Sequence, residues 1–421
     1  MIELNRVMKP KLLVVTSTFP RWQNDTDPPF VYELSRRLVE TFDVTVHTPH
    51  YPGALREERI CGMHIHRFRY FFASCERLAG GQGIVPKLRR NKLYHLLLPF
   101  FLVAQFFSLL LLVAKIRPDV IHAHWLVPQG FWAVVIKKLF KVPVIITAHG
   151  ADVFGLRTPA VIAAKKWIVN NADRVITVSS ALARILCADT QSHQKPDIIP
   201  MGVDASLFSP NKKNEAIRER YGIHGPFLLF VGRLTEKKGV RYLIDAMPKV
   251  INDFPDAKLL IVGHGELEHE LRNQVRQLGF DKVVLFAGGI SNDQLPVYYA
   301  TADLFIGPSV QVRNGDTEGF GLTFVEAAMS GCLVIGTRVG GIEDILVDGQ
   351  TGFLVPPGNT SLLAAKIIHI AKSKENYEEI RRKARRLISG KFDWVVVAEQ
   401  YAMICLSCSG QSRQFAKVAK D

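Results

Sequence analysis

Short apolar runs alternate with longer helical patterns along the whole chain, and this alternation constrains the fold more than any other feature. Runs rich in Val and Ile are typical of strands that are buried on both faces of a parallel sheet. Six stand in the first half: KLLVVTS, DVTVHTP, DVIHAH, PVIITAH, RVITVS and PDIIP. Six more follow: FLLFVG, KLLIVG, VVLFAG, LFIGPS, LVIGT and GFLVPPG. The pattern predicts an α/β fold with parallel sheets and helical crossovers, formed twice.

The two series are separated by PMGVDASLFSPNKK, where Pro200, Gly202 and Pro210 interrupt any regular element. A chain of 421 residues also exceeds the size at which a single hydrophobic core keeps growing. We therefore predict one Rossmann-like, doubly wound domain over residues 1–209 and a second that begins at residue 210.

The net charge of +14 is distributed unevenly. Through Pro210 there are 26 Lys and Arg against 15 Asp and Glu, whereas the remainder has 27 against 24. A basic first half predicts an anionic partner for that half. No nucleic-acid motif is present and the basic residues lack the clustered aromatic interleaving of a stacking platform, so we expect no nucleic acid and favour an anionic membrane surface.

Residues 93–116 (LYHLLLPFFLVAQFFSLLLLVAKI) are long and apolar enough to cross a bilayer of about 30 Å. The strand DVIHAH follows directly and should join the same sheet as KLLVVTS, which a membrane crossing would prevent. We therefore expect a buried or half-buried crossover helix. The basic residues just upstream (Lys87, Arg89, Arg90 and Lys92) suit docking on anionic headgroups, although core packing explains the apolar residues equally well.

The amino end lacks the pattern of a signal peptide, and the six cysteines are scattered. Only Cys405 and Cys408 are close, and no second pair or His cluster completes a metal site. Free thiols in a reducing compartment are the simplest interpretation. We expect a cytoplasmic protein that is peripheral on the inner membrane face.

The stretch from Asp316 to Asn359 is the most informative about function. It follows the strand LFIGPS, so its first residues form a loop at the carboxyl end of a parallel strand, where open α/β sheets bind ligands. Gly319 and Gly321 allow close backbone approach, and the helix behind them offers free N–H groups to a phosphate. Glu318 and Glu326 would repel a nucleotide unless sugar hydroxyls donate hydrogen bonds to them. This combination predicts a carbohydrate-bearing phosphate ligand.

The motif EGFGLTFVEAAMSG, followed by GGIEDILVDGQTGFLVPPG, resembles glycosyltransferase family 4, a retaining family with the GT-B fold. The resemblance covers nearly the whole chain. It implies two Rossmann-like domains that face a central cleft, with a nucleotide-sugar-binding domain over 210–392. It also implies that residues 393–421 form a final helix that returns to the first domain, followed by a tail. By the same resemblance Glu318 touches the transferred sugar, Glu326 binds the ribose, and the amides of Phe320, Gly321 and Leu322 face the diphosphate and sugar.

A second motif, FVGRLTEKKGVRYLIDAM, places Arg233 and Lys238 where a strand runs into a loop and a helix. A departing nucleoside diphosphate develops negative charge, which paired cations and a helix N-terminus can neutralise without a metal. The family resemblance assigns this leaving-group role to both residues.

The first domain contributes PVIITAHGADVF, where His149 and Gly150 follow a strand and Asp152 comes two residues later. The resemblance places His149 beside the donor sugar, as a fourth catalytic residue with Glu318, Arg233 and Lys238. Gly150 and Asp152 join the donor site. The other candidates are Ser179 near the diphosphate, Gly263 and Gly265 near the nucleotide, and His122, His124 and Trp125 near the acceptor.

The loop after the first strand departs from the family pattern, because no glycine stands between Thr16 and Leu38. The backbone contacts attributed to a glycine-rich loop there are therefore in question, and acceptor recognition can differ. Asp25 and Asp27 superficially resemble a metal-binding Asp-x-Asp, but two prolines follow directly. We expect no metal ligands.

Together these features predict a metal-independent glycosyltransferase without a cofactor, whose substrate is a UDP- or GDP-linked sugar. The acceptor would be a glycan or glycolipid, such as a lipid-linked or cell-surface polysaccharide precursor. A sugar-nucleotide epimerase of the same fold remains an alternative, which would turn over donor without acceptor. A non-enzymatic lipid- or nucleic-acid-binding protein is another, in which binding would survive loss of Glu318 and Arg233.

Overall fold

A computed structural model describes residues 9–22, 25, 29–80, 83–84, 87–88, 91–155, 157–313, 315–373 and 377–410. Its residues form two compact units, of which the first contains residues 1–178, 183–199 and 397–421 and the second contains 179–182 and 200–396. Arg89 and Arg90, near the apolar helix, and Asp27, from the Asp-x-Asp pair, lie outside the described residues.

The first unit is built on an eight-stranded sheet in the order β3-β4-β2-β1-β5-β6-β7-β8. All neighbouring strands are parallel except the hairpin of β3 and β4. The strands are β1 (Lys11–Val15), β2 (Asp43–Pro49), β3 (Glu57–Ile60), β4 (Met63–Phe68), β5 (Val120–His124), β6 (Val144–Ala148), β7 (Arg174–Thr177) and β8 (Asp197–Ile198). Every strand predicted in the first half is present, whereas the β3–β4 hairpin was missed.

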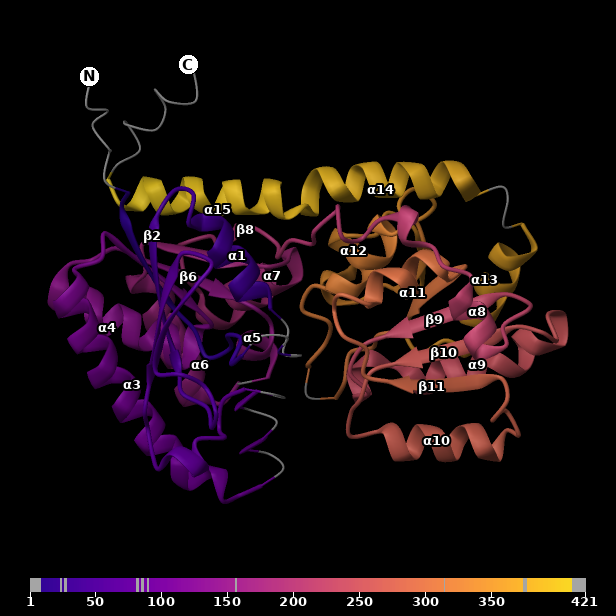
Figure 1. The fold of residues 1–421 in the computed structure, drawn as a ribbon, viewed down its shortest axis with the longest axis horizontal. Helices are drawn as coiled ribbons and strands as arrows, with labels where there is room; N and C mark the ends of the chain where they lie inside the picture. The colour runs from indigo at the N-terminus through magenta and orange to yellow at the C-terminus, as the bar shows by residue number, and fades with distance from the viewer. Residues whose placement is uncertain are drawn as a thin grey trace, which may run out of the picture. The chain divides into compact units, whose positions relative to one another are not determined.

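Helices cover both faces of this sheet (Figure 1). They are α1 (Phe30–Leu38), η1 (Ala73–Cys75), α3 (Tyr94–Ile116), η2 (Leu126–Gly130), α4 (Phe131–Phe140), α5 (Ala151–Phe154), α6 (Pro159–Asn171) and α7 (Ser180–Thr190). Helix α3 connects β4 to β5, which is the crossover that the sequence predicts. It is the one helix in the described part of the chain that is long and apolar enough to cross a membrane, and 28% of its most apolar 18-residue window is buried.

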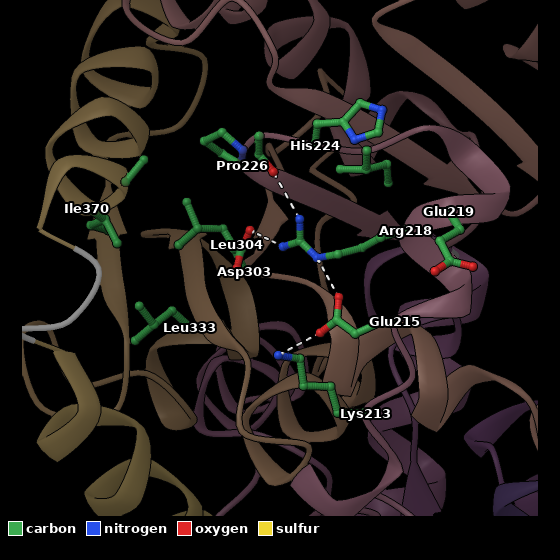
Figure 2. Close-up of a pocket in the computed structure, with 13 residues that line it drawn as sticks. Lys213, Glu215, Arg218, Glu219, His224, Pro226, Asp303, Leu304, Leu333 and Ile370 are labelled. Carbon is green, nitrogen blue, oxygen red and sulfur yellow. Dashed lines mark hydrogen bonds and ion pairs between the residues drawn. The ribbon is translucent and has the colours of Figure 1, made fainter.

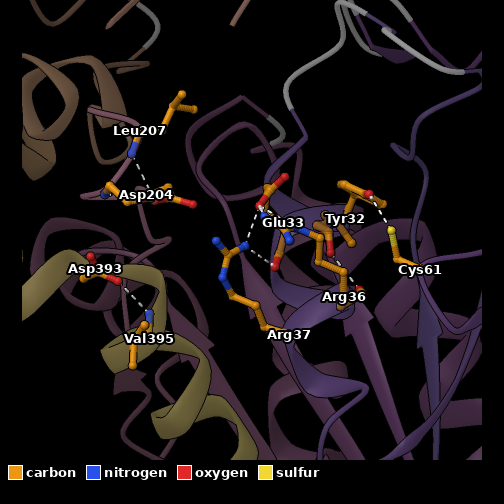
Figure 3. A network of polar contacts seen from close by, with 12 residues as sticks. Tyr32, Glu33, Arg36, Arg37, Cys61, Asp204, Leu207, Asp393 and Val395 are labelled. Atoms are coloured by element: carbon orange, nitrogen blue, oxygen red, sulfur yellow. Dashed lines mark hydrogen bonds and ion pairs between the residues drawn. The ribbon is translucent and has the colours of Figure 1, made fainter. Parts of the chain in front are cut away.

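Helix α1 is held by charge pairs along its own surface (Figure 3). Glu33 in its first turn accepts a hydrogen bond from Arg36 Nε at 2.8 Å and also pairs with Arg37, the spacing at which helix side chains meet. The Tyr32 hydroxyl lies 3.2 Å from Sγ of Cys61, in the turn between β3 and β4. This contact joins the hairpin to α1.

The second unit has a six-stranded parallel sheet in the order β11-β10-β9-β12-β13-β14. Its strands are β9 (Phe227–Val231), β10 (Lys258–Val262), β11 (Val284–Gly288), β12 (Leu304–Gly307), β13 (Leu333–Thr337) and β14 (Phe353–Val355). Numbered from β9, this is the order 3-2-1-4-5-6 of a Rossmann sheet. Buried Leu, Ile and Val from β9, β10 and β12 form the core with one face of α9 and α13. Two Rossmann-like parallel sheets confirm the predicted fold class.

The remaining helices are η3 (Pro210–Lys212), α8 (Ala216–Tyr221), η4 (Glu236–Lys238), α9 (Val240–Asp253), α10 (Glu268–Gln277), α11 (Leu295–Thr301), α12 (Leu322–Met329), η5 (Gly340–Asp344), α13 (Thr360–Lys372), α14 (Glu378–Phe392) and α15 (Trp394–Cys408). From Val397 onward α15 belongs to the first unit. There the Tyr401 hydroxyl donates to the carbonyl of Ile199 at 3.2 Å, and its ring contacts His122. This confirms that the final helix returns to the first domain.

Candidate functional site

The strand order of the second unit brings two loops together. The sheet reverses its order between β9 and β12, which pair directly, and ligands of open α/β sheets bind at the carboxyl ends of strands at such a point. The loop after β9 contains Arg233 and Lys238, and the loop after β12 contains Glu318. Topology alone therefore places these predicted residues on neighbouring loops.

The central contact is an ion pair between Lys238 Nζ and Glu318 Oε2 at 2.5 Å. The Glu318 residue is only 8% exposed. Burial by itself would raise the pKa of Glu318, but the Lys238 ammonium, together with Lys237 and Arg233, outweighs this effect. The pKa of Glu318 is therefore lowered, and the carboxylate stays ionised at neutral pH.

The two other cations of this loop lie further from the carboxylate. Lys237, which was not among the predicted site residues, pairs with Asp316 at 3.1 Å and donates to the carbonyl of Thr317 at 3.3 Å. Arg233 is exposed and acts on Glu318 through space. The loop between β12 and α12 is thus fastened to the β9 loop by two adjacent lysines.

Helix α12 starts directly behind Glu318. Gly321 precedes it with φ of 102°, a left-handed conformation that side chains other than glycine rarely adopt. Phe320 is buried and its ring lies 5.4 Å from that of Phe392, while Leu322 is the first residue of the helix. The backbone amides predicted to face a diphosphate therefore stand at the N-terminus of a helix, where anions are stabilised.

Glu326 lies one turn into α12 and is joined to a residue that no sequence signal indicated. The Tyr299 hydroxyl of α11 donates to Glu326 Oε2 at 2.9 Å. Desolvation raises the pKa of Glu326 to about 7, although Tyr299 and Lys238 oppose this shift. The carboxyls of Glu318 and Glu326 thus have opposite pKa shifts, which is a property of functional sites.

We expect Glu326 to make the protein less stable as the pH rises from about 4.5 to about 7. Its pKa is near 4.5 when unfolded and about 7 when folded, so between these values the folded state binds more protons. A shift of this size corresponds to about 3 kcal/mol once both states are deprotonated. Urea denaturation at pH 5 and pH 7.5 measures the difference. Glu326→Gln should reduce the pH dependence, and an unchanged slope in that variant would contradict the assignment.

The Glu318 loop is supported from behind by the segment after β13. The amide of Gly341 donates to the Glu318 carbonyl at 3.0 Å, and a Cβ on Gly340 would overlap that same carbonyl oxygen. Ser179 Oγ donates to the carbonyl of Gly319 at 2.6 Å, so this predicted donor-site residue contacts the loop itself. Gly340 and Gly341 belong to the motif GGIEDIL, but no sequence signal indicated their role behind the Glu318 loop.

Gly263 and Gly265 have a close-packing role beside the site. A Cβ on Gly263 would overlap the carbonyl of Gly232, and one on Gly265 would overlap the carbonyl of Leu234. Between them, His264 accepts a hydrogen bond from the Leu234 amide at 2.9 Å. The loops after β9 and β10 therefore continue the pairing of the sheet past the ends of the strands.

In the first unit, His149 follows β6 and lies in an aromatic cluster. Its Nε2 is 2.9 Å from His124 Nδ1, and its ring is 4.9 Å from the rings of Trp125 and Phe30. Burial lowers the pKa of His149 to about 3, with a further contribution from His122. His149 is therefore neutral at physiological pH, and its tautomer is coupled to that of His124.

The carboxylate of Asp152 accepts hydrogen bonds from nearby backbone amides. Oδ1 accepts from the amides of His149 at 3.1 Å and Gly150 at 3.0 Å, and Oδ2 accepts from the amide of Leu126 at 2.9 Å. The carboxyl is buried, and desolvation raises its pKa despite these bonds. Asp152 thus holds the turn that presents His149.

A cavity of about 620 Å³ lies elsewhere in the second unit, at the amino ends of β9, β12 and β13 (Figure 2). Two ion pairs lie in its lining, Arg218 with Asp303 at 2.5 Å and Lys213 with Glu215 at 2.8 Å. The predicted site residues are at the carboxyl ends of the strands. This cavity therefore lies at the opposite edge of the sheet from the predicted site residues.

Comparison with known proteins agrees with this arrangement. Residues 29–207 match the family described as Glycosyltransferase Family 4, and residues 213–387 match Glycosyl transferases group 1. Glycogen synthase of Mycobacterium tuberculosis is 30% identical over 307 residues, 71% of this chain and 71% of that protein. The GDP-mannose-dependent alpha-(1-6)-phosphatidylinositol monomannoside mannosyltransferase of Mycolicibacterium smegmatis is 33% identical over 215 residues, 50% of this chain and 56% of that protein.

Among solved structures, sucrose-phosphate synthase from Thermosynechococcus elongatus matches with a TM-score of 0.76 at 23% identity, covering 94% of this chain and 98% of that one. The fold is that of the GT-B glycosyltransferases. The chain belongs to glycosyltransferase family 4 and is an enzyme that transfers sugars.

Proposed function

We propose that this enzyme moves a hexose or related sugar from a UDP- or GDP-linked donor to an acceptor hydroxyl with retention of configuration, and that it needs no metal ion. The observation that carries the proposal is the Lys238–Glu318 ion pair at the switch point of the second sheet, beside the start of α12. It provides a fixed cation, a fixed carboxylate and free helix amides within one loop cluster.

Lys238 and Arg233 would neutralise the departing diphosphate, together with the amides of Phe320, Gly321 and Leu322. Lys238 can contact the diphosphate while it remains paired with Glu318, because an ammonium has three N–H donors. Fixed donors aimed at developing negative charge are among the largest contributions to catalysis. Glu318, held ionised, would accept from sugar hydroxyls and stabilise positive charge at the anomeric carbon.

The remaining predicted residues would position the donor. Glu326 would accept from the ribose hydroxyls, and Gly263 and Gly265 would let the β10 loop lie close to the nucleotide. Ser179 would act near the diphosphate, and His149, Gly150 and Asp152 near the sugar. The neutral state of His149 supports a hydrogen bond to a sugar hydroxyl rather than an ionic contact.

In the proposed reaction the acceptor oxygen bonds to the anomeric carbon on the face from which the diphosphate leaves. The bond between that carbon and the phosphate oxygen breaks, and its electron pair goes to the diphosphate. The acceptor proton passes to the leaving phosphate oxygen. In this scheme Glu318 forms no covalent bond.

We further propose a glycolipid or lipid-linked glycan as acceptor and a cytoplasmic site of action at the membrane. The excess of basic residues in the first half and the lipid substrate in the name of the mycobacterial mannosyltransferase support the acceptor. The six cysteines are all unpaired, which is typical of a reducing compartment.

A panel of UDP- and GDP-sugars, assayed in EDTA for release of nucleoside diphosphate with and without acceptor, tests this function. One donor class should be turned over, the product should keep the anomeric configuration by NMR, and Glu318→Gln should be at least about 100-fold slower. Equal turnover by that variant would remove the role of Glu318. Epimerised donor in the absence of acceptor would replace the proposal with the epimerase alternative.

A further inference from the structure

Helix α3 exposes an apolar stripe along its outer side. The stripe consists of six residues that are 53% to 69% exposed: Leu93, Leu96, Phe100, Val103, Phe107 and Leu111. At 3.6 residues per turn these positions lie within about 80° of one another and extend for about 27 Å. Soluble proteins rarely leave a continuous apolar surface of this extent uncovered.

The polarity of α3 is inverted relative to a soluble helix. Gln105 is fully buried on the side opposite the stripe. Ser108, on the same inner side, has its hydroxyl 3.0 Å from His47 Nε2 of β2 and 3.4 Å from His66 Nε2 of β4. These two polar side chains thus lie on the inner side of α3, and the large apolar residues of the stripe point outward, as expected if the outside is not water.

The charges around the stripe favour contact with an anionic bilayer over contact with a second copy of the protein. Residues 77–118 contain seven Lys and Arg and no Asp or Glu. Among the described ones, Lys92 at the start of α3 and Lys115 and Arg117 at its end are exposed. Two copies of this surface would bring like charges together, whereas an anionic bilayer complements both the ends and the stripe.

The inner side of α3 shows how such a helix would meet the bilayer. Phe101, Leu109, Leu112 and Val113 are buried against the unit, and Phe101 contacts the rings of Phe68 and Tyr70. A spanning helix would have to leave these contacts and separate β4 from β5 of one sheet. Flat insertion of one face to the depth of the headgroup boundary keeps them all.

We infer that α3 is a monotopic membrane helix, whose stripe inserts into an anionic lipid surface while its basic ends contact the headgroups. This inference rests on the proposed function, in that it gives the enzyme the surface by which it would reach a lipid-linked acceptor. Phe72, which is 73% exposed, extends the apolar surface, since Phe71 contacts both Phe72 and Phe100.

Flotation with vesicles of phosphatidylcholine, with and without 30% phosphatidylglycerol (about one lipid in three, a strongly anionic surface), tests the inference on the full chain. The wild type should float with the anionic vesicles, and Leu96→Glu/Val103→Glu should lower the partition coefficient at least about tenfold. The matched control is Val347→Glu/Leu362→Glu, which changes two exposed apolar residues of the second unit and should float like the wild type. All three proteins should have the same melting temperature.

Four outcomes would overturn the inference: no flotation of the wild type, undiminished flotation of the stripe variant, resistance to alkaline extraction as for a spanning helix, or a dimer that the stripe variant dissociates. Transfer to a water-soluble acceptor is measured in parallel and should be unaffected by the stripe substitutions. Transfer without flotation refutes only the membrane helix, and flotation without transfer refutes only the proposed function.

Discussion

Replacing Lys238 by alanine is expected to slow sugar transfer by about 100- to 1,000-fold. The variant loses the cation proposed to neutralise the diphosphate, and it also leaves the Glu318 carboxylate buried without its 2.5 Å partner. Since Lys238 contributes most to lowering the pKa of Glu318, that pKa should rise in the variant. The acidic limb of the pH–rate profile should therefore move to higher pH, which steady-state kinetics from pH 4 to pH 8 would detect.

Lys237→Ala is the matched control, because the neighbouring lysine has the same charge but pairs with Asp316. We expect less than about a tenfold loss of rate and little movement of the acidic limb, since Lys237 acts on Glu318 only from a distance. Equal losses in the two variants would show that the charge of the loop matters and that the specific ion pair does not.

Gly340→Ala should be the most damaging single substitution behind the site. Its φ of 57° is unfavourable for alanine, and the new Cβ would overlap the Glu318 carbonyl oxygen. We expect the free energy of unfolding to fall by about 3 kcal/mol, and the rate of transfer to fall with it as the Glu318 loop is displaced. Calorimetric melting and transfer assays on the same preparation measure both effects.

Gly349→Ala separates the effect of the left-handed backbone from the effect of the overlap with the Glu318 carbonyl oxygen. Gly349 has a similar φ of 73°, but no atom lies within 4 Å of a Cβ placed there. It should cost only about 1 kcal/mol, from the left-handed backbone alone, and leave transfer unchanged. If both glycine variants lost the same stability and kept full activity, Gly340 would have no special relation to the Glu318 loop.

The sequence predicted the sheets well, because buried parallel strands are continuous apolar runs. All twelve predicted strands exist, and Arg233, Lys238 and Glu318 come together because parallel strands end at one edge. The β3–β4 hairpin was not predicted because the sequence of β3, EERI, is typical of a charged surface segment. The adjacent Cys61 and Gly62, both with positive φ, form a two-residue turn that alternation in MHIHRF could have revealed.

Other features could not be predicted, since they depend on packing between distant segments. Tyr299 reaches Glu326 only because α11 packs beside α12, and the raised pKa of Glu326 follows from that burial. The direction in which α3 exposes its apolar residues was hidden because the helix is apolar all round. Gln105 and Ser108 stand among apolar residues in the sequence, and only the structure shows that they mark the inner face of the helix.

The backbone pairing that continues past β9 and β10 has a consequence for engineering donor preference. The amide of Gly232 donates to the Val262 carbonyl at 3.0 Å, and the amide of Leu267 donates to the Leu234 carbonyl at 3.1 Å. The backbone conformation of each loop therefore depends on the other. We therefore expect that an insertion into one loop, or its transplantation by itself, would disrupt both. If these loops contact the nucleotide as proposed, a chimera that exchanges donor preference should replace residues 232–239 and 263–267 together.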